Sequence, residues 1–352
     1  MLALIALVSE GTVTFALKTV SCFIANAAIL LGTSALIAAK PPAPSVRSIG
    51  PTELEMQVLL DRADFSPGEI DGKGGKNSRE ALAAFQAARG LAPGTRSRKA
   101  VLKALGAGAV YPIVSYTITA KDAAGPFAET IPEDAKEQSK LPGLYYTSVL
   151  EELGERFHSA PALLKRLNPR ARFTAEEHIR VPNVLGAEPA APDAARAARV
   201  NGQRVPAKGR RAPAQAGVKV VVSKRASVLM VYDREGHVIF YAPVTSGSEH
   251  DPLSLGNWVV TSVVRNPTYN YNPDLFWDAD PANVKVKIAA GPNNPVGVVW
   301  IGINEPHYGI HGTPEPGEIG HSESHGCVRM TNWDASRVAN LVKDGTPVVF
   351  EE

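Results

Sequence analysis

One stretch of 19 residues, from His311 to Arg329, concentrates the residue types that do covalent chemistry. It contains Cys327, three of the chain's eight histidines and several glycines. A thiol is nucleophilic as the thiolate, and an unperturbed cysteine supplies little thiolate at neutral pH, so a neighbouring imidazole has to take the proton. Gly326 beside the sulfur leaves room for backbone N–H groups to approach a developing oxyanion. The stretch therefore indicates acyl transfer through a thioester.

Two other interpretations of the same residues stay open. His311, His321, His325 and Cys327 carry the imidazole and thiolate ligands that zinc prefers. His307 also stands four residues before His311, but no glutamate follows it as a helical His-Glu-x-x-His site requires. A buried, inert cysteine is common in proteins, although polar and glycine residues immediately precede this one. We expect acyl transfer and no metal.

The motifs His311-Gly-Thr and Ser324-His-Gly-Cys-Val-Arg329, with the histidine sixteen residues before the cysteine, closely resemble the L,D-transpeptidase catalytic domain of the YkuD family. The resemblance covers Val218 to Phe350 and includes Tyr241-Ala-Pro-Val-Thr-Ser-Gly247. It implies a mainly-β catalytic domain, a β-sandwich with short helices, within a multidomain α+β chain. It also implies that no metal or organic cofactor is needed.

The resemblance implies that Cys327 is the nucleophile and His311 the proton donor and acceptor. Four residues complete the signature: Ser324, His325, Gly326 and Arg329. We hypothesise that the carbonyl of Gly312 orients His311 and that N–H groups around Gly326 and Cys327 form the oxyanion hole. His325 is expected to shape the pocket rather than to act as the base.

Substrate contacts are expected from Arg329, Tyr308, Tyr269 and Trp277. The forked guanidinium of Arg329 could hold a substrate carboxylate, or it could instead pin the loop to a carbonyl. Residues 266–277 are aromatic and rich in Asn and Pro, without a regular period. Long irregular loops in compact domains are often functional, so this segment is predicted to be a lid over the site, the alternative being a surface loop with buried aromatic anchors.

The family resemblance implies that the donor is a peptidoglycan tetrapeptide stem. The thiol would attack the carbonyl before the terminal D-alanine, release that residue, and pass the acyl chain to an amine, which gives a 3→3 cross-link. Water as acceptor would make a carboxypeptidase, and a lipoprotein amine would make an anchoring enzyme. The rival classes are a non-catalytic wall-binding scaffold and a cell-wall amidase, whose cysteine usually precedes its histidine.

The upstream part divides into smaller units. Residues 51–106 show three short helical runs around a turn cluster, and their PGEIDG…SREALAAFQAARGL pattern resembles a peptidoglycan-binding domain. A generic three-helix domain without a ligand is the alternative. Residues 141–184 resemble a degenerate LysM module, without a clear first strand, and glycan strands are the expected partner. Residues 185–216 form an Ala/Pro/Arg linker.

Residues 217–352 are predicted to be a β-rich domain that ends with a helix and a last strand. Short runs rich in β-branched and aromatic residues follow one another through this block. Asp334 is expected to cap a helix over Ala335 to Val342, with Gly345 beyond it as a stop signal.

Residues 1–40 are predicted to be a signal peptide or a membrane anchor, because an uncharged stretch follows Lys18 and ends in small residues. Either would place the chain in the periplasm or cell envelope, with a tether in the second case; a buried helix is the third alternative. The 37 Lys and Arg against 35 Asp and Glu, a net charge of +2, give no reason to expect a nucleic-acid partner. Cys22 and Cys327 are the only cysteines, which excludes a disulfide framework. The sequence carries no signal for an oligomeric state.

Overall fold

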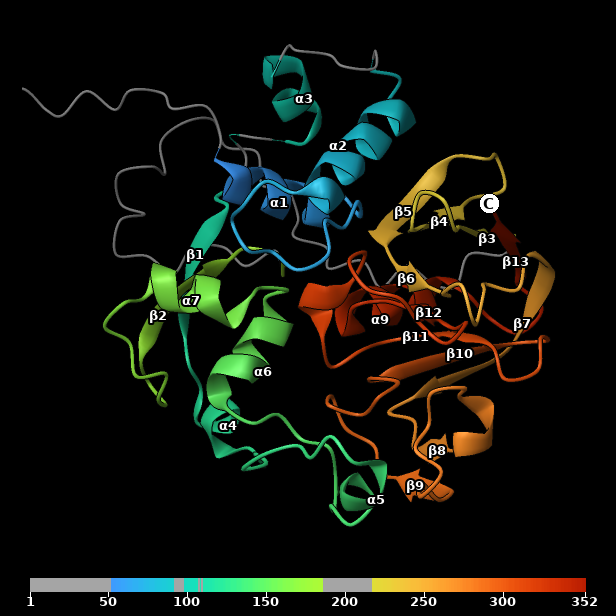
Figure 1. Cartoon of the computed structure of the whole chain (residues 1–352). Coiled ribbons are helices and arrows are strands. Elements are labelled where there is room, and N and C mark those ends of the chain that lie inside the picture. The colour runs from blue at the N-terminus through green and yellow to red at the C-terminus, as the bar shows by residue number, and fades with distance from the viewer. Residues whose placement is uncertain (1–51, 92–97, 107, 109, 186–216) are drawn as a thin grey trace, which may run out of the picture. The chain divides into compact units, whose positions relative to one another are not determined.

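The computed structural model describes residues 52–91, 98–106, 108, 110–185 and 217–352, which belong to one compact unit, Ser48–Glu352 (Figure 1). The predicted leader, residues 1–40, and all of the predicted linker except Leu185 lie outside the described residues. Among the helices that are described, none combines the length and the apolar character needed to cross a membrane.

The C-terminal block forms a mixed sheet of nine strands in the order β5-β4-β3-β13-β7-β10-β11-β12-β6 (Figure 1). Its strands are β3 (Lys219–Ser223), β4 (Val228–Tyr232), β5 (Val238–Pro243), β6 (Thr245–Ser246), β7 (Gly256–Arg265), β10 (Val299–Ile303), β11 (Gly309–His311), β12 (Val328–Arg329) and β13 (Pro347–Glu351). The long β7 joins the two halves, because it pairs with both β13 and β10. The mainly-β prediction for this block is confirmed.

The core of this block lies between the sheet and α9 (Asn332–Leu341), which contacts β10 and β11. Val338 on α9 and Ile310 and Val328 on the strands are fully buried there. The predicted cap of this helix was wrong by one turn. Thr331 is the N-cap, since its backbone is extended and its hydroxyl accepts a hydrogen bond from the Asp334 N–H at 3.2 Å.

The three predicted N-terminal helices are present as α1 (Glu53–Arg62), α2 (Lys76–Ala88) and α3 (Arg98–Ala104). Thr52 caps α1 by accepting from the Glu55 N–H at 3.2 Å. The apolar side of this module packs partly on the catalytic sheet, where the ring of Phe65 stacks on Tyr241 at 6.3 Å. The helical module and the sheet thus share one core cluster.

A second small unit lies between the helical module and the nine-stranded sheet in the sequence. Strand β2 (His178–Pro182) pairs antiparallel with β1 (Ile113–Thr117), and α6 (Val149–Arg156) and α7 (Pro161–Leu167) pack beside them. The first strand that the sequence pattern lacked is therefore supplied by residues ahead of position 141. Two short helices, α4 (Ala120–Ala124) and α5 (Ala135–Gln138), occupy the connection.

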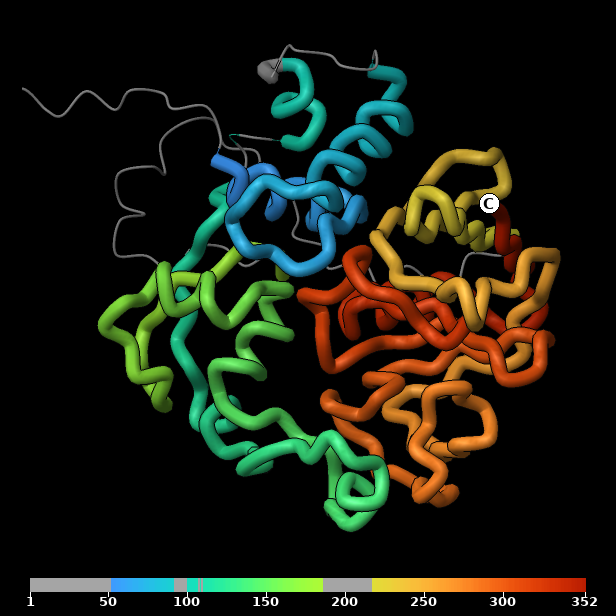
Figure 2. Tube along the Cα trace, in the orientation of Figure 1, coloured from blue at the N-terminus to red at the C-terminus, as the bar shows by residue number. Residues whose placement is uncertain are grey.

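Buried polar contacts tie these units to α9. The fully buried carboxylate of Asp61, near the end of α1, accepts from both terminal nitrogens of Arg337 at 2.8 and 3.0 Å. Nδ1 of His158 lies 3.0 Å from the same carboxylate. The hydroxyl of Ser66 donates to Asp334 at 2.7 Å, and Figure 2 shows this blue turn next to the red α9. The N-terminal module is thus docked on α9 through buried charged and polar groups.

Candidate functional site

The register of β11 and β12 places His311 beside Arg329. The two strands are parallel, with Ile310 opposite Val328 and His311 opposite Arg329. Because side chains alternate along a strand, the pair Ile310 and Val328, both fully buried in the core, faces the opposite way from His311 and Arg329. Cys327 lies in the bend just before β12, two residues ahead of Arg329. The charge of Arg329 acts on the pKa of both His311 and Cys327, so both side chains lie near this guanidinium.

The imidazole of His311 is held in one tautomer. Its Nδ1 lies 2.7 Å from the carbonyl oxygen of Gly312, which can only accept, so Nδ1 carries the proton and Nε2 is left as the acceptor. The ring stacks on Trp300 with centroids 5.5 Å apart. Burial lowers the pKa of His311 to about 4, against the opposing effect of the Gly312 carbonyl. The side chain is thus a neutral imidazole at pH 7.

The thiol of Cys327 is partly exposed, and its sulfur lies 3.5 Å from the carbonyl oxygen of His307. Burial raises the pKa of this thiol, while the N–H of Gly309 and the charge of Arg329 act in the opposite direction. The raised pKa of Cys327 and the lowered pKa of His311 both favour the neutral form of each side chain at pH 7.

The loop before the sulfur is fixed by Ser324 and Gly326. The buried hydroxyl of Ser324 donates to the carbonyl of Cys327 at 2.7 Å and accepts from the N–H of Gly247 at 2.6 Å. Gly326 has a φ of +95°, and a Cβ at this position would come within 2.8 Å of the Tyr308 ring. Tyr308 therefore packs directly on the loop that carries the sulfur, which only glycine permits.

His325 points toward the predicted lid. Its Nε2 lies 2.9 Å from a carboxylate oxygen of Asp278, and the Phe276 ring meets it edge-on with centroids 5.0 Å apart. Nη1 of Arg329 lies 3.5 Å from the carbonyl oxygen of Glu323, a long hydrogen bond that follows the expectation of loop pinning.

The predicted lid, residues 266–277, contains β8 (Tyr269–Tyr271) and the 3₁₀ turn η1 (Pro273–Leu275). Strand β8 pairs antiparallel with β9 (Val286–Ile288), which follows the lid in the chain. Burial, and next the charge on Cys327, raise the pKa of Tyr269 to about 12, so its hydroxyl lies near the sulfur. Trp277 is 61% exposed and packs on His250 at 4.2 Å. The segment brings Tyr269 to the site and leaves Trp277 at its rim.

Two residues at the site carry no signal in a catalytic motif. Trp300 covers His311, and its place opposite His311 follows from strand alternation alone. Asn332 opens α9, and its Oδ1 accepts from the N–H of Val298 at 3.1 Å. A Cβ built on Gly312 would lie 2.2 Å from the same oxygen. The Asn332 amide therefore packs closely against Gly312, whose carbonyl orients His311.

The alternative zinc set is not brought together. Among the described residues, the one group of three or more metal-ligating side chains close enough to share an ion is Asp233, Glu235 and His237, in the exposed turn between β4 and β5. His321 follows the turn η2 (Pro316–Glu318), is exposed, and donates its N–H to the carbonyl of Glu318 at 3.0 Å.

Comparisons with known proteins give family matches for two parts of the chain. Residues 217–350 match the family model of the L,D-transpeptidase catalytic domain (YkuD), and residues 52–94 match that of a "Putative peptidoglycan binding domain". The "Putative L,D-transpeptidase YkuD" of Bacillus licheniformis is 30% identical over 147 residues, which cover 42% of this chain and 73% of the relative. The "Probable L,D-transpeptidase YbiS" of Escherichia coli is 29% identical over 136 residues, 37% of this chain and 44% of the relative. A crystal structure of L,D-transpeptidase 3 from Mycobacterium tuberculosis with a faropenem-derived adduct is 19% identical, with a TM-score of 0.33, over 39% of this chain and 60% of that one.

Proposed function

The chain belongs to the L,D-transpeptidases of the YkuD family, and from that premise we propose that Cys327 and His311 form its acyl-transfer pair, acting on peptidoglycan stem peptides. The observation that carries this proposal is the strand register, which pairs His311 with Arg329, two residues after Cys327, while the Gly312 carbonyl leaves Nε2 of His311 as the proton acceptor. The Gly312 carbonyl fixes the tautomer, as a general base needs.

The first half-reaction follows from the neutral pair. As the sulfur of Cys327 attacks the carbonyl carbon before the terminal D-alanine, its proton passes to Nε2 of His311. Backbone N–H groups around Gly326 and Cys327 hold the oxyanion. The C–N bond then breaks, the leaving amine takes the proton from His311, and D-alanine departs. The acyl chain remains on the sulfur as a thioester.

The second half-reaction reverses these proton transfers. An amine of a neighbouring stem gives its proton to Nε2 of His311 and attacks the thioester carbon. The C–S bond breaks, the thiol of Cys327 recovers a proton, and the product is a 3→3 cross-linked pair of stems. Arg329 and Tyr308 keep the loop and sulfur in place, while Tyr269 forms part of the wall against which the donor peptide lies. His325 holds the lid segment through Asp278.

The upstream units serve the same substrate. Residues 52–94, within the proposed module 51–106, hold peptidoglycan strands near the catalytic face, and the match to a peptidoglycan-binding model supports this role. The unit proposed over 141–184, extended by β1, acts as a second wall-facing or spacing module. Residues 1–40 direct the chain to the envelope, where its substrate lies, and 185–216 connect the modules to the catalytic domain, residues 217–352.

Acylation by a carbapenem tests the nucleophile. We expect one adduct on the full chain by intact mass and none on Cys327→Ala, with His311→Gln acylated at least about tenfold more slowly. An equal adduct on Cys327→Ala, or none on the wild type, would refute the assignment. Incubation with muropeptides then identifies the acceptor. Dimers indicate transpeptidation, and tripeptides without dimers indicate a carboxypeptidase.

A further inference from the structure

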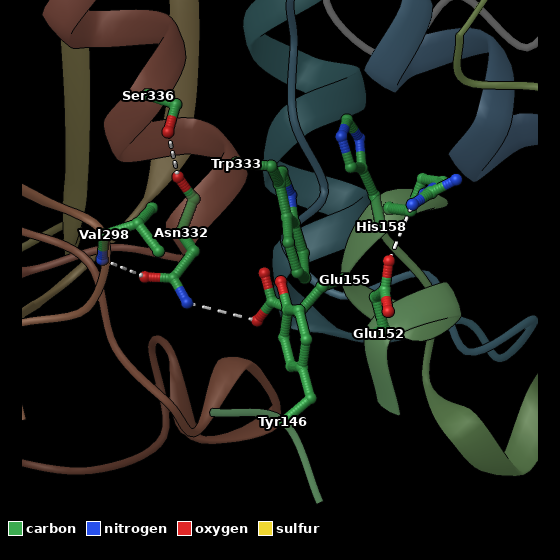
Figure 3. Close-up of a pocket in the computed structure, with 9 residues that line it drawn as sticks. Tyr146, Glu152, Glu155, His158, Val298, Asn332, Trp333 and Ser336 are labelled. Atoms are coloured by element: carbon green, nitrogen blue, oxygen red, sulfur yellow. Dashed lines mark hydrogen bonds and ion pairs between the residues drawn. The ribbon is translucent and has the colours of Figure 1, made fainter. Parts of the chain in front are cut away.

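A second pocket lies away from the sulfur, between α6 and α9 (Figure 3). Its volume is about 320 Å³, and its lining includes Tyr146, Glu152, Glu155, Asn332 and Trp333. None of the residues proposed above to take part in acyl transfer lines it. At about 30 Å³ per water molecule, the space would hold a compound of up to roughly ten non-hydrogen atoms.

The charges around this pocket favour a cation. The guanidinium of Arg156 is already used, since it pairs with Asp122 at 2.6 Å and with Glu152 at 2.7 Å. Glu155 receives only an amide hydrogen bond, from Asn332 Nδ2 at 3.3 Å, and no cation among the described residues pairs with it. Asp122 and Glu152 therefore neutralise the charge of Arg156. The carboxyl of Glu155 is left without a cationic partner among the described residues. A ligand ammonium group would complete its coordination.

Trp333 adds a second requirement. Its side chain is 93% buried (7% exposed), lines the pocket, and has an Nε1–H that donates to no acceptor in the described part of the chain. In Figure 3 the Trp333 indole lies beside His158, and the two rings stack with centroids 5.1 Å apart. A buried donor without a partner costs free energy, which a ligand oxygen in the pocket would recover.

A metal ion fits this pocket poorly. Its carboxylates and His158 are not among the side chains that lie close enough to share an ion in the described residues. The aromatic faces of Tyr146 and Trp333 and the apolar Val298 instead suit an organic cation with a short carbon frame.

We propose that this pocket binds a small compound that carries an ammonium group next to a hydrogen-bond acceptor oxygen, the chemistry of an amino acid or an aminoacyl unit. Glu155 pairs with the ammonium group, and Nε1–H of Trp333 donates to the acceptor oxygen. Two sources provide this chemistry in a cell wall: a free amino acid, and the amine-bearing residue of a stem peptide.

Binding is linked to a proton on Glu155. Burial, relieved in part by the Asn332 hydrogen bond, raises the pKa of this carboxyl to about 8. The titratable and charged groups that face it from the surrounding elements are Glu69, Tyr146, Glu151, Glu152, Arg156 and Asp334. At pH 7 the empty pocket holds the neutral acid. An arriving ammonium favours the carboxylate, so Glu155 releases one proton to solvent and the ligand keeps its own.

The pocket is connected to the catalytic face through Asn332, an inference that rests on the proposed function. Nδ2 of Asn332 contacts Glu155, and its Oδ1 packs against the backbone of Gly312, whose carbonyl orients His311. A ligand that pulls on Glu155 therefore acts on the residue that holds the tautomer of His311. Asn332 is a positioning residue in this arrangement.

Binding is measured on full-length Cys327→Ala protein, which cannot form a thioester, by calorimetry at pH 7. The probes are glycinamide, its isostere without charge, propionamide, and its isostere without acceptor, propylammonium. We expect glycinamide to bind at least about tenfold more tightly than either isostere. Titration in two buffers of different ionisation enthalpy should show up to one proton released.

Matched variants localise the site. Glu155→Gln should weaken glycinamide at least about tenfold and abolish proton release, while Glu129→Gln, at an exposed carboxylate outside the pocket, should change neither. Trp333→Phe should remove the advantage of glycinamide over propylammonium. Equal binding of all three probes, no binding of any, or unchanged binding by Glu155→Gln would overturn the proposal.

Two further arms complete the test. D-Alanine and a stem tripeptide with a free side-chain amine, titrated in parallel, distinguish the two sources, because only the physiological one should match or exceed glycinamide; if neither does, both sources are rejected. For the wild type, the carbapenem acylation rate is compared with and without glycinamide, since this step needs no acceptor amine. A rate change of at least about twofold that Asn332→Ser removes supports the coupling. An unchanged rate refutes the coupling, whereas absent acylation would refute the proposed function and leave the binding result intact.

Discussion

Replacing Gly326 by alanine tests how the loop that carries the sulfur is held. The backbone at this position has a φ of +95°, and the new Cβ would lie 2.8 to 3.0 Å from two ring carbons and the hydroxyl oxygen of Tyr308. The positive φ costs an alanine about 1–2 kcal/mol. The contact with the ring costs about 1–3 kcal/mol more unless the ring moves away. Since the sulfur is on the next residue, a displaced loop should slow acylation at least about tenfold.

Gly236 provides the matched control. It also has a positive φ, of +83°, but a Cβ there would meet no atom within 4 Å. Gly236→Ala should therefore lower the free energy of unfolding only by the backbone cost of the positive φ. It should be acylated at the wild-type rate. Urea denaturation gives the free energies, and carbapenem acylation followed by intact mass gives the rates.

A double variant separates the clash from the backbone strain. If the Tyr308 ring causes the loss, Gly326→Ala combined with Tyr308→Ala should be less destabilised than the sum of the two single changes, by about 0.5–3 kcal/mol. If Gly326→Ala and Gly236→Ala show the same loss of unfolding free energy and the same acylation rate, the packing of Tyr308 on the loop does not position the sulfur. That result would refute the proposed role of this contact.

Three further predictions concern charged and titratable groups. Asp61→Asn should lower the free energy of unfolding by about 3–5 kcal/mol, because it leaves the Arg337 guanidinium facing a buried neutral amide; a loss below about 1 kcal/mol in urea denaturation would show that the docking contact contributes little. The rate of carbapenem acylation should stay flat from pH 7 to pH 5 and fall near pH 4, where His311 takes up a proton in the folded protein; a midpoint near 6.5 would contradict the burial of this ring. The pKa of Glu155 is about 8 in the folded protein and near 4.5 when unfolded, so its contribution to stability is fully present below pH 4 and is lost as the pH rises through 8. Urea denaturation of Glu155→Gln from pH 5 to 8 should accordingly show a smaller loss of stability than the wild type, and identical slopes would rule out the raised pKa.

The catalytic motif could be read from the sequence because its signal is local. Cys327, Gly326 and Ser324 are consecutive or nearly so, and their chemistry is evident from residue types alone. The three N-terminal helices were also predictable, since each has its own apolar period and turn signals. The prediction of a mainly-β C-terminal block followed from short β-branched runs in the same way.

Contacts between distant residues could not be read in that way. Asp61 and Arg337 are 276 residues apart, and nothing in the sequence around either residue shows that the two side chains form a buried ion pair. The strand β1 went unrecognised because its partner β2 lies more than sixty residues further along the chain. The cap of α9 was misplaced since both Thr331 and Asp334 are good capping types, and only the extended backbone at Thr331 distinguishes them.

The assignment of side chains within the site shows the same division. His325 is adjacent to the cysteine motif in sequence, yet its ring is committed to Asp278, forty-seven residues earlier. Trp300 has no place in any motif, yet it covers the face of His311. Proximity in sequence identified the loop, whereas the sheet register pairs His311, and not His325, with Arg329.

The ion pair between α1 and α9 has a consequence for wall architecture. Arg337 belongs to α9, which begins three residues after β12, and it pairs with Asp61, so the module that carries Asp61 is held against the helix that follows the Cys327 loop. A glycan chain bound by residues 52–94, as proposed above, would lie at a constant distance from the thiol of Cys327. Cross-links would then form at a regular spacing along that chain, whereas a flexible tether would allow a variable spacing.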